Sequence, residues 1–110
     1  MLRTDDTDRV RLLTLDRPEA LNAFNQALYH GLAEAIEEAA TDDSVSVVVV
    51  TGEGRAFSAG NDLLEMAAQN DGGSTGPLGH GFPRLLDALR EFPKPFICAV
   101  NGLALGIGAT

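Results

Sequence analysis

The run VSVVVV, Val45 to Val50, constrains the fold more than any other part of this sequence. It is nearly all β-branched and apolar, which is the pattern of a strand buried on both faces in a parallel sheet that helices cover. A second apolar run, FICAV from Phe96 to Val100, has the same character. Parallel strands need long crossover connections, usually helical, so the chain is predicted to be an α/β protein.

Helical periodicity lies between the strand candidates. From Asn25 to Ala39, apolar residues recur at helical spacing, and Asn25 is a suitable N-cap for this helix. A second helix is predicted over Phe82 to Leu89, because its apolar residues return to helical spacing, and the prolines that follow end it. The run VRLLTL, Val10 to Leu15, predicts a strand before the first helix. The predicted order is strand, helix, strand, helix, strand and a glycine-rich turn.

Composition bears on the partners and the location. The 110 residues fit one domain, and the net charge of −8 argues against nucleic acid as a partner. The apolar runs are much shorter than the ~20 residues of a membrane helix, so no membrane span is expected. The single Cys98 cannot form an internal disulfide and the N-terminus is charged, so we expect a cytoplasmic protein with Cys98 in its core. Residues 70–78 are predicted to be a flexible loop inside the domain, because glycines and small polar residues dominate them.

Two glycine-rich loops each follow a buried strand: GEGRAFSAGND and NGLALGIGAT. Open α/β sheets bind ligands at the carboxyl ends of their strands, and glycines let the backbone approach a ligand closely. Two such loops can aim one N–H each at a single oxygen, which is the geometry of an oxyanion hole. Two alternatives stay open. The glycines can simply permit close packing, or the chain can be a non-catalytic phosphate or nucleotide-binding module, although neither GxGxxG nor a lysine-bearing phosphate loop occurs.

Three stretches resemble the enoyl-CoA hydratase/isomerase family, also called the crotonase family. They are RPEALNAF (Arg17 to Phe24), GRAFSAGNDL (Gly54 to Leu63) and KPFICAVNGLALGIG (Lys94 to Gly108), in the family's order and spacing. The resemblance implies a spiral of strand-strand-helix units, with residues 1–110 as the N-terminal part of one such domain. It also implies an acyl-CoA enzyme in which two backbone N–H groups hold the thioester oxygen while an enolate forms. By position, these donors would be Asn61 and Ile107.

The same resemblance implies further contacts with the acyl-CoA. The positions that would contact the substrate are Ala20, Leu21, Ala59, Gly60, Asp62, Leu63 and Gly106. Coenzyme A would enter as part of the substrate, with no separate cofactor and no metal. The complete protein would assemble as a homotrimer or hexamer.

One position departs from the hydratases of this family. They carry a glutamate where this chain has Thr110, and threonine cannot act as a carboxylate base. The resemblance therefore favours double-bond isomerisation, with hydration or another crotonase-family reaction as the alternative. Family members are much longer, so we expect an N-terminal portion whose acid/base residue lies beyond Thr110, and the activity of residues 1–110 alone stays open.

Several residues also have plainer interpretations. Ser58 lacks the glycine–serine–glycine elbow of a nucleophile and is not expected to be catalytic. Asp62 either caps a short helix near Asn61 or faces the ligand. Neither His30 nor His80 has a second ligand at metal-binding spacing.

Overall fold

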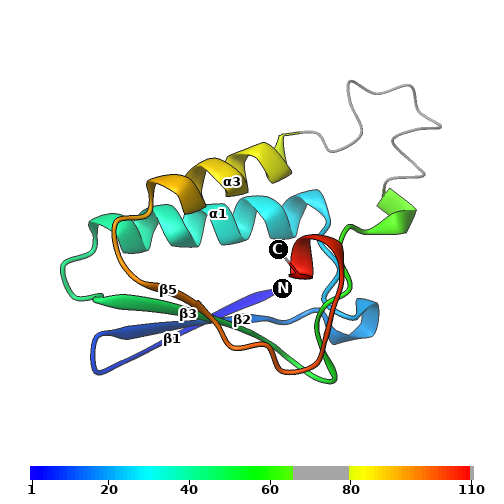
Figure 1. Cartoon of the computed structure of the whole chain (residues 1–110), viewed down its shortest axis with the longest axis horizontal. Coiled ribbons are helices and arrows are strands. Elements are labelled where there is room, and N and C mark those ends of the chain that lie inside the picture. Colours follow the sequence, from blue (N-terminus) through cyan, green and yellow to red (C-terminus); the bar gives the residue numbers. More distant parts are fainter. Residues whose placement is uncertain (66–79, 110) are drawn as a thin grey trace.

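In the computed structural model, which describes residues 1–65 and 80–109, two helices cover one face of a four-stranded sheet (Figure 1). The strand order in this sheet is β1-β2-β3-β5, and a second sheet pairs β4 with β6. The elements are β1 (Leu2–Thr7), β2 (Val10–Leu15), the 3-10 helix η1 (Pro18–Ala20), α1 (Gln26–Thr41), β3 (Val47–Gly52), β4 (Ala56–Ser58), α3 (Gly81–Glu91), β5 (Phe96–Cys98), β6 (Leu103–Ala104) and the 3-10 helix η2 (Gly106–Ala109). The predicted α/β class is confirmed.

Two sequence-based predictions concern residues that the structure does not describe. The flexible loop at residues 70–78 lies outside the described residues, and so does Thr110. Among the described helices, none is long and apolar enough to cross a membrane.

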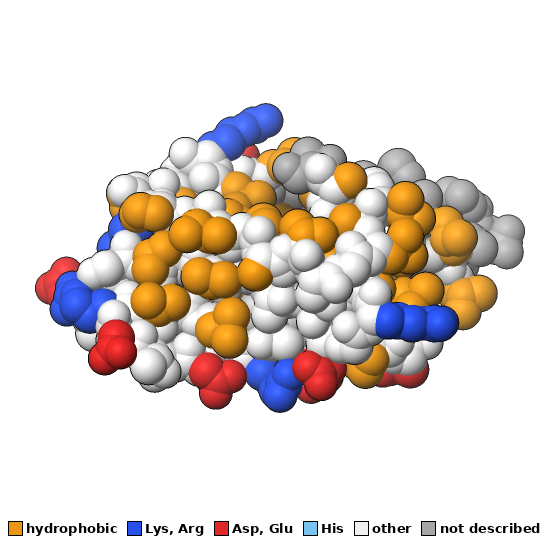
Figure 2. Space-filling view, turned by 60° about the horizontal axis from the view of Figure 1, so that its bottom comes forward, with side chains coloured by type: hydrophobic (Ala, Val, Ile, Leu, Met, Phe, Trp, Pro, Cys, Tyr) orange, Lys and Arg blue, Asp and Glu red, His pale blue; other side chains and the backbone are white. Residues whose placement is uncertain are grey.

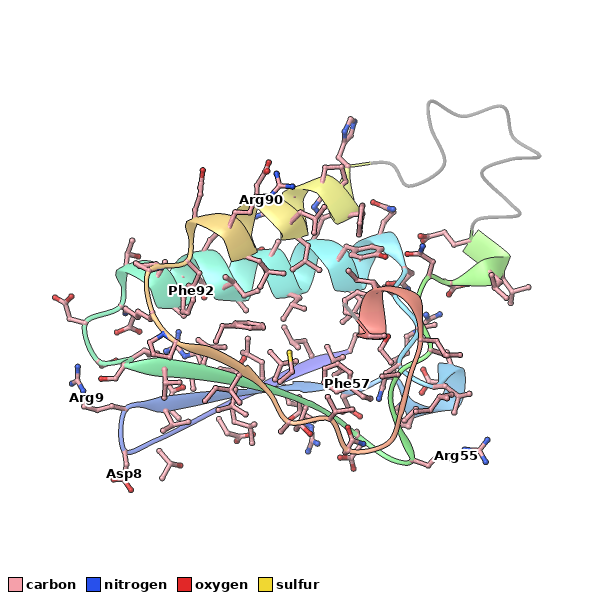
Figure 3. All side chains as sticks on the ribbon, in the orientation of Figure 1. Asp8, Arg9, Arg55, Phe57, Arg90 and Phe92 are labelled. Carbon is pink, nitrogen blue, oxygen red and sulfur yellow. The ribbon has the colours of Figure 1, made fainter. Side chains whose placement is uncertain are left out.

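The chain opens with an antiparallel hairpin of which only the second strand, β2, was predicted. The two strands pair along their full lengths, and the turn residues Asp8 and Arg9 have φ angles of 51° and 69°. Left-handed conformations at both positions are typical of a two-residue type I′ turn. Figure 3 labels both residues at the tip of the hairpin. Sequence reasoning missed β1 because five of its six residues are exposed, which leaves no apolar alternation to detect.

Helix α1 follows its prediction closely. Asn25 is the N-cap, and its side-chain oxygen accepts a hydrogen bond from the Leu28 N–H at 2.8 Å. The buried residues of α1 are Leu28, Tyr29, Leu32, Ala33, Ile36 and Ala39. Helix α3 packs beside α1 and buries Leu85 and Ala88, so the two helices and the sheet enclose one apolar core.

Strand β3 was predicted to be buried on both faces, and this prediction is wrong for the described chain. In β3, Val48 and Val50 are buried, whereas Val47 and Val49 are only half-buried, because α1 and α3 lie on the same side of the sheet (Figure 1). The strand also begins two residues later than predicted, since its pairing with β2 runs from Val47 to Gly52. Figure 2 turns the lower side of the molecule in Figure 1 toward the reader. Hydrophobic side chains gather on the surface that this view shows.

The predicted buried strand at Phe96 to Val100 is also corrected. Strand β5 covers Phe96–Cys98 only and lies at the edge of the sheet, where it pairs with β3 alone. Ile97 is 51% exposed and Cys98 is exposed, so the expectation that Cys98 lies in the core is wrong. An edge strand has one neighbour, and α1 and α3 leave its outer side chains uncovered.

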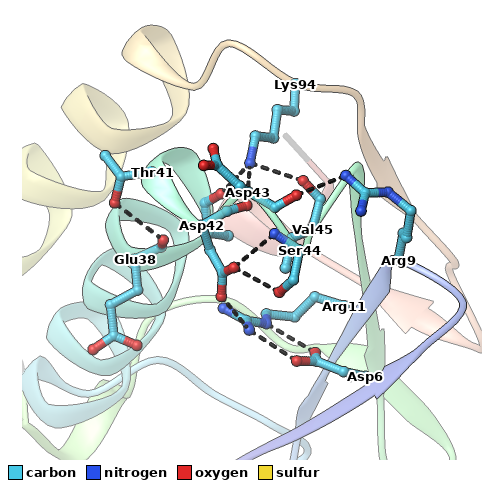
Figure 4. A network of polar contacts seen from close by, with 11 residues as sticks. Asp6, Arg9, Arg11, Glu38, Thr41, Asp42, Asp43, Ser44, Val45 and Lys94 are labelled. Atoms are coloured by element: carbon cyan, nitrogen blue, oxygen red, sulfur yellow. Dashed lines mark hydrogen bonds and ion pairs between the residues drawn. The ribbon is translucent and has the colours of Figure 1, made fainter.

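A cluster of polar groups holds the C-terminal end of α1 against the sheet (Figure 4). The Lys94 Nζ donates to the carbonyl oxygens of Ala39, Asp42 and Val45 at 2.7, 2.8 and 2.8 Å. The carboxylate of Asp42 accepts from Ser44, whose hydrogen bonds are the main reason that the pKa of Asp42 falls to about 2. A lysine at this place satisfies carbonyls that the end of a helix leaves without intrahelical partners.

Candidate active site

The two glycine-rich loops come together through a pair of short strands. Each loop contains one strand, β4 in the first and β6 in the second, and these pair in parallel. The pairing continues beyond β6, where the Leu105 N–H donates to the Ser58 carbonyl at 3.0 Å. The two segments therefore leave this small sheet side by side. The first leads to Asn61 and the second to Ile107, the two predicted donors.

The glycines before the two predicted donors lie close to each other. Gly60 has a φ of 98° and Gly106 a φ of 56°, so both adopt the left-handed region that favours glycine. A Cβ placed on Gly60 would lie 3.0 Å from the Leu105 carbonyl oxygen and 3.8 Å from the Gly106 Cα. At Gly60 a side chain would therefore crowd the Leu105 carbonyl.

Asn61 has a backbone N–H that points away from its neighbouring segment. Phe24 forms a parallel bridge with Asn61: the Phe24 N–H donates to Gly60 O at 2.6 Å, and the Asp62 N–H donates to Phe24 O at 2.8 Å. In such a bridge the central residue directs its own N–H to the opposite side. Within the described residues, the Asn61 N–H has no acceptor.

Ile107 occupies the corresponding position in the second loop. It lies in the first turn of η2, which the Gly108 N–H closes by donating to Leu105 O at 2.8 Å. N–H groups in a first helical turn have no intrahelical acceptor, and the Ile107 N–H finds none elsewhere in the described chain. The structure thus brings together two loops that each carry one N–H without a backbone acceptor in the described part of the chain.

Two asparagines that sequence reasoning overlooked support the first loop. Asn22 is fully buried, and its Nδ2 donates to the carbonyls of Glu53 and Ala56 at 3.0 and 2.9 Å. Asn101 donates to Gly54 O at 3.0 Å and to Ala56 O at 3.2 Å. Both lie inside the stretches that carry the family resemblance, but their role depends on contacts between distant segments. No local pattern could have revealed it.

A cavity of about 260 Å³ adjoins Asn61. It is lined by Arg17, Ala20, Ala23, Ala59, Asn61, Asp62, Leu63 and Leu64. The structure therefore brings together Ala20, Ala59, Asp62 and Leu63 of the predicted substrate contacts. Gly60, Gly106 and Leu21 do not line this cavity.

Leu21 acts through its backbone instead. Its carbonyl oxygen accepts from the Ala59 N–H at 3.0 Å, and its φ of 53° is left-handed. Asn22 follows with a φ of 56°. Two successive non-glycine residues in this region are strained, and such strain concentrates at functional sites.

Asp62 ties the cavity wall together. Its carboxylate forms an ion pair with Arg17 at 2.8 Å and accepts from the Glu65 N–H at 3.0 Å. The hydrogen bond from Glu65, followed by that from Arg17, lowers the pKa of Asp62. Of the two interpretations of Asp62, the cap is confirmed, since residues 63–65 are helical. Its place on the cavity wall leaves the contact with a ligand as a prediction.

A second cavity, of about 340 Å³, lies between the helices and the sheet and reaches the Ile107 side chain. Its walls are almost entirely apolar and include Phe57, Leu85 and Cys98. Figure 3 labels Phe57, which is 5% exposed. Ile107 and Gly108 of the second glycine-rich loop line this space.

Ser58 is buried and fully engaged. Its Oγ donates to Asn22 O at 2.8 Å and accepts from the Gly60 N–H at 3.2 Å, and its side chain has no exposed surface. Ser58→Ala should lower the free energy of unfolding by about 1 to 3 kcal/mol, because it leaves a buried N–H unpaired. Turnover of the folded variant should fall less than about tenfold. Urea unfolding and steady-state kinetics measure both, and a covalent acyl adduct on Ser58 would contradict this assignment.

Comparison with known proteins shows the family to which this chain is similar. Residues 5–110 match the model of the enoyl-CoA hydratase/isomerase family. A 2,3-dehydroadipyl-CoA hydratase of Escherichia coli is 53% identical over 91% of this chain and 38% of its own length. A 1,2-epoxyphenylacetyl-CoA isomerase of the same organism is 44% identical over 92% of this chain and 40% of its own. The chain thus spans about two fifths of these relatives.

Solved structures show the same fold. The crystal structure of an enoyl-CoA hydratase from Mycobacterium marinum superposes with a TM-score of 0.91 at 57% identity. The match covers 98% of this chain and 51% of the other. The predicted α/β arrangement of strand-strand-helix units is therefore confirmed for the portion that this chain represents.

Proposed function

Because the chain belongs to the enoyl-CoA hydratase/isomerase family, we propose that the complete protein binds an acyl-CoA and holds its thioester oxygen between the N–H groups of Asn61 and Ile107. The observation that supports this proposal is the close approach of the loops at Gly60 and Gly106, each followed by a residue whose N–H has no backbone acceptor among the described residues. When a proton leaves the carbon beside the thioester, its electron pair delocalises onto that oxygen. Each well-placed donor stabilises such a charge by about 3 kcal/mol.

The cavity beside Asn61 supports a place for the coenzyme A part of the substrate. Ala20, Ala59 and Leu63 line it, and the Arg17–Asp62 ion pair braces its wall. Coenzyme A enters as part of the substrate in this proposal, and no further cofactor is required. Assembly as a homotrimer or hexamer and a cytoplasmic location remain expectations from the resemblance and the sequence.

Among the reactions of the family, we propose double-bond isomerisation. Thr110 supports this choice, since it offers no carboxylate to activate water. The relatives include a 2,3-dehydroadipyl-CoA hydratase and a 1,2-epoxyphenylacetyl-CoA isomerase, so their names do not favour either reaction. Hydration is the alternative.

An assay of the natural protein with matched substrates separates the two reactions. We expect isomerisation of a 3-enoyl-CoA to exceed hydration of the 2-enoyl-CoA of the same chain length by about a hundredfold, the usual contribution of a missing general base. Measurement at several chain lengths guards against a poor acyl fit. Hydration at a rate equal to or above isomerisation would overturn the choice of reaction, whereas no binding of any acyl-CoA would overturn the proposed function itself.

A further inference from the structure

Tyr29 lies beneath the first donor loop and is held rigidly. Its side chain is 1% exposed, and its ring packs between Phe24 and Phe82, with ring centroids 4.8 and 5.9 Å away. Phe24 is also the residue whose backbone pairs with both neighbours of Asn61. The ring of Tyr29 is therefore fixed against the same residue that fixes the loop.

The hydroxyl of Tyr29 donates to the side-chain oxygen of Asn61. Burial, followed by the nearby charge of Glu65, raises the pKa of Tyr29 to about 12. The hydroxyl accordingly stays protonated, and remains a donor, throughout the neutral range. The same turn of α1 makes a second link to this segment, since the Gln26 N–H donates to Glu65 Oε1 at 2.8 Å.

These contacts restrain Asn61 from three directions. Phe24 holds the backbone on either side of Asn61, the Arg17–Asp62 ion pair holds the next residue, and Tyr29 holds the Asn61 side chain. Among the described residues, the Asn61 N–H has no backbone acceptor. A donor that is fixed before the reaction starts stabilises developing charge without reorganising.

We propose that Tyr29 is a positioning residue for the oxyanion hole: its hydroxyl holds the Asn61 side chain and thereby fixes the direction of the Asn61 N–H. This inference rests on the proposed function. Tyr29 does not touch the substrate in this account, so its removal should affect the transition state and leave substrate binding nearly unchanged. Asn61 is half-buried, so its freed side-chain oxygen can turn to solvent at little cost in stability.

The test is Tyr29→Phe in the natural protein, which keeps the packed ring and removes only the hydroxyl. We expect kcat to fall about tenfold, with KM for the acyl-CoA within twofold of wild type, as for an interaction expressed in the transition state. His30→Leu is the matched control. It removes a contact with Arg84 from the next residue of the same helix, away from the loop, and should leave kcat within twofold.

A double-mutant cycle with Asn61→Ala decides whether Tyr29 acts through Asn61. Both single variants keep the backbone N–H, and the double variant should be no slower than the slower single variant. Additive losses, or a Tyr29→Phe variant with wild-type kcat, would overturn the inference while leaving the proposed function intact. A wild-type protein that turns over no acyl-CoA would instead overturn the proposed function.

Discussion

Replacing Gly60 by valine is expected to lower kcat of the natural protein at least a hundredfold. Gly60 has a left-handed φ of 98°, which valine adopts only with strain. Its Cβ would lie 3.0 Å from the Leu105 carbonyl oxygen, and the two γ-methyl groups would need space that the loops do not leave. The loops would have to shift apart, which would displace the two N–H groups that we propose as donors to the thioester oxygen. Loss of one oxyanion donor alone costs about 10² to 10³ in kcat.

Steady-state kinetics on the folded variant measure this effect. Gly31→Val is the matched control, because apart from the neighbouring backbone of α1 no atom lies within 4 Å of a Cβ at this position, and its kcat should stay within twofold of wild type. Circular dichroism should show that both variants are folded. A folded Gly60→Val protein with kcat within threefold of wild type would show that this contact does not shape the reacting site.

The second large effect concerns stability. Lys94→Met should lower the free energy of unfolding by about 2 to 4 kcal/mol, because three carbonyl oxygens lose one charged donor together. The ammonium group also lies at the C-terminal end of α1, where the helix dipole favours a positive charge. Methionine preserves the length of the side chain, so the loss reports on the charge and its hydrogen bonds.

Urea unfolding monitored by circular dichroism compares the variants. Arg90→Met is the control, since the Arg90 side chain is 74% exposed and its ion pair with Asp87 spans 3.8 Å. Surface pairs of this kind contribute little, so we expect less than about 0.5 kcal/mol. Equal losses in the two variants would mean that the three carbonyls are satisfied by water when Lys94 is absent.

Sequence reasoning predicted the elements that have a strong period. Helix α1 and its cap at Asn25 were found at their true positions, because burial of one stripe leaves a pattern that survives in the sequence. Strand β2 was also found at its true position, from its run of apolar and β-branched residues. Strand β1 was missed, since it is charged and exposed and is held only by pairing with β2. The start of β3 was misplaced for a related reason. The pairing of β3 with β2 determines where β3 begins and ends, and the residues of β3 alone do not reveal these limits.

The candidate site also contains residues that the sequence could predict and residues that it could not. Glycines at positions 60 and 106 indicate close approach of the backbone, so the sequence could predict that two loops meet a ligand. The family resemblance then identified Asn61 and Ile107 as the predicted donors. Asn22, Asn101 and Tyr29 could not be found, because each acts on a segment distant in the chain, and nothing local distinguishes a bracing asparagine from one in a turn.

The central claim is that one oxygen lies between two backbone N–H groups. A crystal structure of the natural protein with a bound unreactive acyl-CoA, such as butyryl-CoA, tests it directly. We expect the thioester oxygen within about 3.2 Å of both the Asn61 and the Ile107 nitrogen atoms, the range of an N–H···O hydrogen bond. A well-ordered thioester whose oxygen contacts neither nitrogen, or a coenzyme A bound away from these loops, would contradict the account.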